Sequence, residues 1–133
     1  MKEELRFVGV IHSELKMLQD CPKQEHENAP VATIEIFDDF INAAKDLKPR
    51  DSIILFTWLH KADRSTLKTK PRNNITLPLT GVFSTRSPDR PNPIGIHFVR
   101  LVEVEPPNSF KVSGLEVLDN TPLVDIKPDL WRD

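Results

Sequence analysis

With 133 residues and a mass of 15.2 kDa, the chain has the length of one domain. It holds 12 prolines but only 4 glycines, and these glycines are not spaced as in the loops that bind nucleotides. The net charge of -2 lacks the strongly basic balance of proteins that bind nucleic acid by their overall charge. A nucleotide or cofactor site in this chain must therefore be built without a glycine-rich loop.

The sequence also favours a reducing, aqueous environment. Its one cysteine, Cys21, cannot form a disulfide within the chain, which is typical of intracellular proteins. The apolar runs are all shorter than the roughly 18 residues that a membrane helix needs. The acidic N-terminal segment leads into a strand-like pattern and does not resemble a signal peptide. We therefore expect a cytoplasmic protein without a membrane segment.

Alternation of apolar and polar residues dominates the chain and predicts short strands. In chain order, the expected strands are 5–12, 31–37, 52–58, 96–105, 110–117 and 123–126.

One helix is expected between the acidic pair Asp38 and Asp39 and the helix-ending Pro49, because apolar residues recur there at helical spacing. Six or seven short strands without regular strand–helix alternation predict a mainly β fold with one or two short helices. We expect this antiparallel sheet to form a barrel or a sandwich, in a single domain spanning residues 1–133.

Two segments, 16–30 and 61–74, show no regular pattern. The second holds five basic residues against the single acid Asp63: Lys61, Arg64, Lys68, Lys70 and Arg72. A basic loop of this kind is most often a solvated surface, although it also suits a phosphate backbone.

The stretch 85–95 has the highest density of chemically useful residues. Its three prolines restrict the backbone, which holds Ser87, Arg90 and Asn92 extended and prepared for a ligand. Arg86 and Arg90 carry planar forks that suit phosphate or carboxylate, and Asn92 offers both a donor and an acceptor. The competing interpretation is a stiff turn whose arginines pair with surface carboxylates.

A second polar stretch, 118–128, begins with an Asp-Asn-Thr-Pro turn. Asp125 and Lys127 flank Ile126 and therefore point to the same side of a strand. This arrangement fits either a weak surface ion pair or a charged pair that faces a pocket.

The remaining candidates are weaker. The four histidines show no zinc-binding spacing, so we expect no metal site. Cys21 has no identifiable base beside it. His60 and Lys61 directly follow an apolar strand, where either a capped strand end or a functional pair is expected.

Together these motifs closely resemble the TsaA-like or TrmO family of tRNA adenosine N6-methyltransferases. The resemblance spans nearly the whole chain, in the family's order, over residues 8–13, 22–24, 81–87, 90–95, 118–122 and 124–128. It implies a β-barrel that uses S-adenosylmethionine, with a homodimer that places the cofactor sites near the subunit interface. It also implies a substrate, the tRNA anticodon loop, in which N6 of N6-threonylcarbamoyladenosine at position 37 receives the methyl group.

The resemblance assigns the cofactor-binding residues by position, and the chemistry of the side chains gives the candidates for substrate binding and catalysis. Substrate binding falls on Arg86, Arg90, Asn92 and Lys127. Catalysis falls on Asn92, which would polarise N6, and on Asp119 or Asp125 as proton acceptor. Cofactor binding falls on Pro22, Lys23, Gln24, His60, Lys61, Arg86, Ile96, Leu118, Asp119, Asn120 and Thr121.

Two positions depart from the family's pattern. Asn120 stands where the family usually has glycine, and Asp129 stands where it usually has tyrosine. Asparagine tolerates left-handed backbone geometry better than most residues, so the turn at Asn120 can form. Two alternatives stay open: an enzyme of this family that acts on another RNA or a small molecule, and a binding module without catalytic activity.

Overall fold

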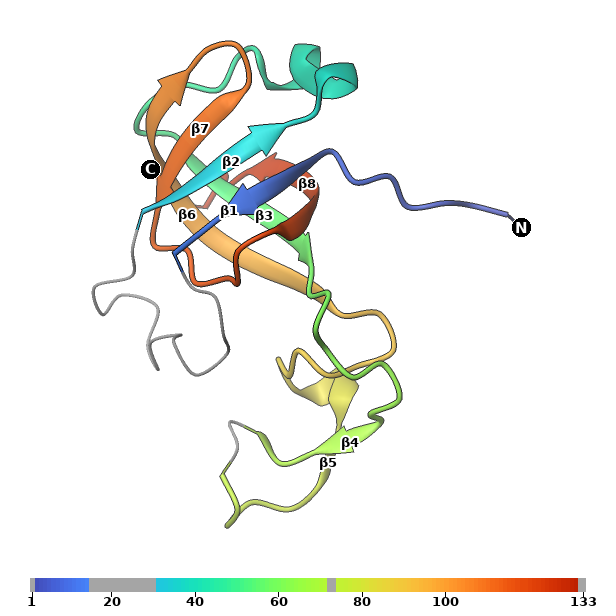
Figure 1. Ribbon diagram of the computed structural model, residues 1–133. Coiled ribbons are helices and arrows are strands. Elements are labelled where there is room, and N and C mark those ends of the chain that lie inside the picture. Colours follow the sequence, from blue (N-terminus) through green and yellow to red (C-terminus); the bar gives the residue numbers. More distant parts are fainter. Residues whose placement is uncertain (1, 15–30, 72–73, 132–133) are drawn as a thin grey trace.

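The protein is described by a computed structural model that covers residues 2–14, 31–71 and 74–131. Six antiparallel strands close into a barrel in the order β1-β2-β7-β6-β3-β8, and the pairing of β1 with β8 completes the ring (Figure 1). The mainly β, antiparallel fold is therefore confirmed. The strands of the barrel are β1 (Gly9–His12), β2 (Ala32–Ile36), β3 (Ser52–Trp58), β6 (Ile94–Glu105), β7 (Ser109–Ser113) and β8 (Thr121–Pro128).

Alternation along the strands fills the barrel interior. In β3, Ile53, Leu55 and Thr57 are buried, while the residues between them are partly exposed. The apolar members of this set stabilise the fold because each fully buried aliphatic side chain contributes roughly 1.5–3 kcal/mol. The completely or almost completely buried apolar side chains of the core include Ile11, Ile34, Ile53, Leu55, Leu101, Val112, Leu115 and Leu123.

The long strand β6 presents two alternating faces, as its sequence predicts. Gly95, Val99 and Leu101 are buried, so this face points inward. The pairing with β7 shifts between Leu101 and Glu103, and beyond the shift Val104 packs against the core instead. The shift is a bulge-like irregularity, which reverses the faces of a strand.

Three strands differ from the predicted ones more than the others do. The first strand begins at Gly9 rather than at Leu5. Going along the described chain, Val8 is the first residue for which hydrogen bonds to the barrel strands are found. Strand β7 ends at Ser113 because Gly114 adopts a φ of 84°, a left-handed conformation that breaks the ladder. Strand β8 extends over 121–128, beyond the predicted 123–126, because its pairing with β1 and β3 continues on both sides.

The expected helix forms a 3-10 helix, η2 (Asp38–Ala44), rather than an α-helix. Its first hydrogen bond joins Phe40 N to Phe37 O at 2.9 Å, a spacing of three residues. The segment is too short for a stable α-helix on its own, and no side chain caps its start. None of the helices in the described part of the chain has both the length and the apolar composition for spanning a bilayer.

Residues 59–93, which connect β3 to β6, form what we call the connecting lobe. Figure 1 shows it projecting from one end of the barrel. It contains a two-stranded sheet of β4 (Lys68–Thr69) and β5 (Thr80–Gly81), followed by the 3-10 turn η4 (Val82–Ser84). The segment 61–74, for which the sequence shows no regular pattern, therefore contributes one very short strand among its described residues.

Candidate functional site

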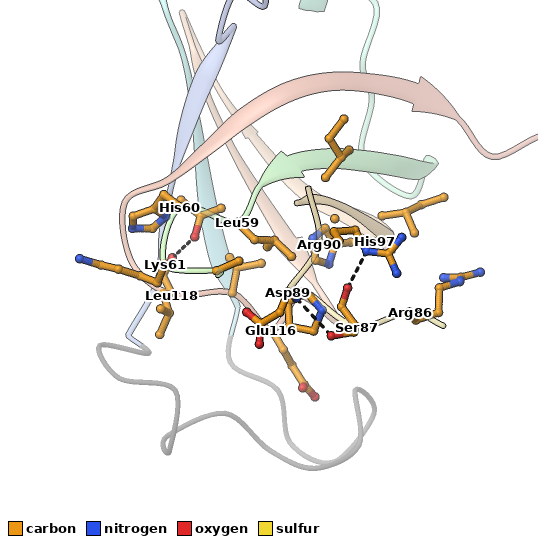
Figure 2. Close-up of a pocket in the computed structure, with 17 residues that line it drawn as sticks. Leu59, His60, Lys61, Arg86, Ser87, Asp89, Arg90, His97, Glu116 and Leu118 are labelled. Carbon is orange, nitrogen blue, oxygen red and sulfur yellow. Dashed lines mark hydrogen bonds between the residues drawn. The ribbon is translucent and has the colours of Figure 1, made fainter. Parts of the chain in front are cut away.

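A cavity of about 510 Å³ lies where the end of the barrel meets the connecting lobe (Figure 2). Its volume falls within the range of about 300–1,000 Å³ that is usual for small-molecule sites. Three segments far apart in sequence build it: 59–62 after β3, 86–97 around the proline-rich stretch, and 116–121 before β8. Seven of the predicted site residues line it, namely His60, Lys61, Arg86, Arg90, Ile96, Leu118 and Thr121.

Strand pairing explains why these segments meet. Strand β3 pairs with β6 up to Trp58 and Ile94, and Leu59 N then donates to Pro93 O at 2.8 Å. On its other side β3 pairs with β8, with Thr57 opposite Leu123. The turn before β8 is thereby brought to the same end of the barrel. Figure 2 shows His60, Lys61 and Leu118 on one side of the cavity and Arg86 on the other.

Arg90 organises the proline-rich loop. Its Nε donates to Ser87 O at 2.7 Å, and its Nη2 donates to Val82 O at 2.7 Å and to Thr85 O. The guanidinium therefore serves the backbone of its own loop, which favours a positioning role over direct contact with substrate. Arg86 differs, since its exposed side chain forms no hydrogen bond or ion pair with another described residue. Arg86 is thus available to a ligand.

Asn92 is held by Arg64, another residue of the lobe that the sequence motifs do not single out. Arg64 Nε donates to Pro91 O at 2.7 Å, and its Nη2 donates to Asn92 Oδ1 at 3.3 Å. The Arg64 guanidinium also lies 5.0 Å from the centre of the Trp58 ring, a cation–π contact. Asn92 does not line the cavity itself, and its predicted catalytic role stays a prediction.

The predicted turn at residues 118–121 is well anchored. Asp119 Oδ1 accepts a hydrogen bond from Ser13 N at 2.8 Å, and Asn120 N donates to Ile11 O at 2.8 Å. The buried Thr121 hydroxyl donates to Leu118 O at 2.6 Å. Asn120 has a φ of 66°, which explains why glycine is usual at this position and why asparagine is compatible with it.

Asp125 and Lys127 share a face of β8, as their spacing predicts, but this face points away from the barrel interior. They pair with Phe56 and Ile54, which lie between the buried residues of β3, whereas Ile126 packs against the core. Lys127 Nζ lies 5.9 Å from the centre of the Phe56 ring. Neither charged residue lines the cavity, and their predicted roles stay predictions.

His97 is the most informative residue that the sequence interpretation does not assign to the site. It lines the cavity, and its Nε2 lies 2.8 Å from Oγ1 of the fully buried Thr57. Burial lowers the pKa of His97 to about 4, so the imidazole is neutral near pH 7. A Cβ on Gly95 would come within 2.5 Å of Thr57 Oγ1 and 2.8 Å of His97 Nε2. The glycine therefore makes room for this pair.

The sequence does contain a signal for His97, since it alternates with Val99 and Leu101 on the inner face of β6. Glu116 also lines the cavity, and the sequence does not single it out, because a charged residue between the buried Leu115 and Val117 fits ordinary strand alternation. The pKa of His60 is lowered by burial and by the neighbouring Lys61 charge, so this side chain also tends to neutrality.

Several other residues named from the sequence are not found among the described residues that line the cavity. Pro22, Lys23 and Gln24, together with Cys21, lie outside the described residues. Asp129, at the position where the family usually has tyrosine, is buried and accepts a hydrogen bond from Trp131 N at 3.1 Å. Within the described residues, His, Cys, Asp and Glu side chains form no group of three suited to a metal ion.

Comparison with known proteins now identifies the family. The model of the tRNA-methyltransferase O N-terminal domain matches residues 10–132. The chain belongs to the TrmO family. Its TrmO fold is seen in the crystal structure of TrmO from Pseudomonas aeruginosa, with a TM-score of 0.76 and 30% identity. The match covers 98% of this chain but 57% of that one, so the chain spans little more than half of the solved protein.

Relatives similar to this chain include two archaeal proteins. One, from Methanothermobacter thermautotrophicus, is named "Probable S-adenosyl-L-methionine-binding protein" and is 38% identical over 96% of this chain and 90% of its own length. The "S-adenosyl-L-methionine-binding protein" of Archaeoglobus fulgidus is 39% identical over 92% of this chain and 86% of its own length. The cofactor expected from the sequence is the ligand for which both relatives are named.

Proposed function

We propose that this protein is an S-adenosylmethionine-dependent methyltransferase that acts on N6 of N6-threonylcarbamoyladenosine at position 37 of tRNA. We further propose that it works in the cytoplasm as a homodimer. The observation that carries the proposal is the cavity of about 510 Å³, which is lined by residues from three distant segments that we predict to bind the cofactor. Membership of the family and the names of its relatives support the same function.

The lining of the cavity fits S-adenosylmethionine chemically. Leu59, Ile96 and Leu118 supply apolar surface for its uncharged parts. Glu116 and Asp89 supply carboxylates for positive charge, and Lys61 and Arg86 supply cations for a carboxylate. When bound, the cofactor supplies a methyl group on a positively charged sulfur.

A neutral histidine suits a cavity that takes a cation. His97 stays uncharged near pH 7 because its pKa is lowered to about 4 by burial, so it does not repel a positive ligand. Its contact with Thr57 and the small Gly95 fix its ring at the cavity wall. We assign His97 a positioning role, in which it shapes the cavity and keeps its electrostatic potential from becoming more positive.

Features of the connecting lobe favour RNA as the methyl acceptor. Lys61, Arg64 and Arg86 offer positive charge to phosphates beside the cavity. Phe83 is 87% exposed next to this segment, and exposed aromatic rings stack on unpaired bases. Cations and a free aromatic ring together suit a single-stranded loop such as an anticodon loop.

Two features bear on the acceptor chemistry. N6 of adenine is a poor nucleophile because its lone pair is drawn into the ring. A group that accepts a hydrogen bond from the N6–H raises the electron density on this nitrogen. We propose that Asn92 Oδ1 accepts this bond, which requires it to exchange its long 3.3 Å contact with Arg64. We propose Asp119, in the turn that lines the cavity through Leu118 and Thr121, as the acceptor of the surplus proton.

A homodimer agrees with the apolar surface of the lobe. Leu67, Ile75 and Leu79 are 66%, 82% and 63% exposed, and association with a second copy of the chain would cover apolar side chains of this kind. Sedimentation velocity of the full chain tests this part of the proposal, because a monomer at micromolar concentration would contradict it.

The experiment that tests the function combines binding and turnover. Calorimetry with S-adenosylmethionine should give saturable binding to the wild type and a large loss of affinity for Arg86→Ala. Transfer of labelled methyl groups should then occur to tRNA that carries N6-threonylcarbamoyladenosine and not to the same tRNA with plain adenosine. Cofactor binding without any transfer to the modified tRNA would reject the proposed reaction and favour a binding module or another substrate.

Asn92→Ala separates the catalytic proposal from cofactor binding. We expect the variant to bind S-adenosylmethionine as the wild type does and to transfer methyl groups at least about tenfold more slowly, since a hydrogen bond to a group that becomes charged contributes about 1.5–3 kcal/mol. Full transfer by this variant would show that Asn92 does not polarise N6.

A further inference from the structure

A second cavity adjoins the first one across the proline-rich loop. It has a volume of about 650 Å³ and lies between the β4–β5 hairpin and the residues that follow η4. Three residues, Arg86, Ser87 and Pro88, line both cavities and form the wall between them. An enzyme that transfers a group between two ligands needs two adjoining sites of this kind.

The lining of the second cavity is chemically one-sided. Lys70 and Arg86 contribute positive charge, and Thr69 and Ser84 contribute hydroxyl groups, whereas the Thr85 hydroxyl donates to Val82 O at 3.0 Å. Among the described residues, no carboxylate lines this cavity. Two cations surrounded by hydroxyl donors are suited to an anion with several oxygen atoms, such as a carboxylate or a phosphate.

The two cations are placed in different ways. Lys70 Nζ donates to Ile75 O at 2.9 Å, which fixes the ammonium group and leaves its charge without a carboxylate in the described part of the chain. Arg86 has no partner among the described residues, in contrast to Arg90, whose guanidinium donates to loop carbonyls. Because Arg90 and the prolines hold the loop, the Arg86 fork is offered from a rigid support.

We propose that the second cavity binds an anionic group of the methyl acceptor through Lys70 and Arg86. This inference rests on the proposed function, because it names the part of the acceptor that this cavity holds. Two anions have the required chemistry: the carboxylate of the threonylcarbamoyl group and a phosphate of the RNA backbone. Either one would fix the acceptor beside the cofactor cavity through the shared wall.

The test uses Lys70→Gln, with Lys68→Gln as the matched control. Both lysines belong to the same hairpin and both substitutions remove one charge, but Lys68 is exposed and does not line the cavity. Binding is measured with two probes: the nucleoside N6-threonylcarbamoyladenosine, and an anticodon stem-loop RNA without this modification. The nucleoside contains the carboxylate and no phosphate, whereas the RNA contains phosphates and no such carboxylate.

We expect Lys70→Gln to lower the affinity for one of the two probes about tenfold, as is usual for the loss of a hydrogen bond to a charged group. Lys68→Gln should lower the same affinity less than about twofold. Weaker binding of the nucleoside identifies the carboxylate as the ligand, and weaker binding of only the RNA identifies a phosphate. Equal effects of the two substitutions on both probes would overturn the proposal.

Affinity for S-adenosylmethionine, measured on the same variants, should stay unchanged, because Lys70 does not line the first cavity. A loss of cofactor affinity in Lys70→Gln as large as its loss for the probes would also overturn the proposal. Since both readouts are binding constants, they judge the second cavity even if the wild type fails to methylate the modified tRNA. That failure would reject the proposed reaction alone.

Discussion

The barrel and the connecting lobe differ in how far their apolar side chains are exposed to solvent. In the barrel, Ile11, Leu55 and Leu123 are completely buried, whereas in the lobe Ile75 and Phe83 are 82% and 87% exposed. The barrel has a closed hydrogen-bond ladder, and the lobe has one sheet of two very short strands. Such a small sheet is marginal by itself, so the stability of the protein must reside in the barrel. The lobe presents groups for binding, and the first cavity forms where the two regions meet.

Truncation of one leucine in each region tests this difference most strongly. Leu55→Ala removes a side chain that is 0% exposed and should lower the free energy of unfolding by about 2–5 kcal/mol. Leu79→Ala removes the same atoms from a side chain that is 63% exposed, and should change the free energy by less than about 0.5 kcal/mol. Urea unfolding followed by circular dichroism measures both values. Comparable losses for the two variants would show that the lobe contributes to the core.

The next prediction concerns His97, at the boundary between barrel and cavity. Its pKa is lowered from 6.5 to about 4 by burial, so the unfolded chain binds a proton at a higher pH than the folded protein does. Its contribution to stability is therefore fully present above pH 6.5 and is lost as the pH falls towards 4. Between pH 7.5 and 4.5 the loss amounts to about 2–3 kcal/mol.

Replacement of the imidazole isolates this contribution from other titrating groups. His97→Gln, which has no charge to gain, should lose about 2–3 kcal/mol less than the wild type over the same pH range. His12→Gln serves as the control, because His12 is an exposed histidine paired with Glu35 at 2.9 Å. If wild type and His97→Gln follow parallel stability curves from pH 7.5 to 4.5, His97 is not buried as described.

Gly95 provides a smaller test at the same boundary. A Cβ at this position would come within 2.5 Å of Thr57 Oγ1, and both neighbours are packed, so Gly95→Ala should cost about 2 kcal/mol. A Cβ on Gly81, in the lobe, would meet no atom within 4 Å, and Gly81→Ala should be nearly neutral. Melting curves give the stabilities, and calorimetry should show weaker cofactor binding for Gly95→Ala alone. A neutral Gly95→Ala would mean that the Thr57–His97 pair is free to move.

Sequence information was sufficient for the barrel strands because alternation is a local property. Residues 52–58 form a strand with the predicted bounds, and Ala32–Ile36 lies within the predicted 31–37. The 3-10 form of η2 was not predicted, because apolar spacing over so few residues does not distinguish it from an α-helix. Local alternation of apolar and polar residues thus predicts the strands better than it predicts the type of the short helix, which depends on the surrounding fold.

The site shows the same division. His60, Arg86 and Leu118 were expected together from the family's motifs, and the strand pairing brings them to one cavity. The outward direction of Asp125 depends on the register shift between Phe56 and Thr57, which no local pattern reveals. The use of Arg90 by backbone carbonyls likewise depends on the fold of the whole loop.

The smallest expected effect is a difference in tRNA affinity between variants that lack an exposed aromatic ring in the lobe or near the barrel. Phe83, in the lobe, is 87% exposed, and Trp131, after β8 at the barrel, is 92% exposed. If the lobe receives the anticodon loop, Phe83→Ala should weaken tRNA binding about fivefold, corresponding to roughly 1 kcal/mol for one lost stacking contact. Trp131→Ala should leave the affinity unchanged although it removes a larger ring of equal exposure.

Fluorescence anisotropy with labelled anticodon stem-loop RNA measures both affinities, and neither substitution should alter the melting temperature, because neither ring is buried. The two rings have similar exposed fractions, so a difference in RNA affinity between the two variants must come from where the rings lie. A larger loss for Trp131→Ala than for Phe83→Ala would place the RNA on the barrel. It would also make the exposed apolar side chains of the lobe, Leu67, Ile75 and Leu79, a surface for protein contact alone.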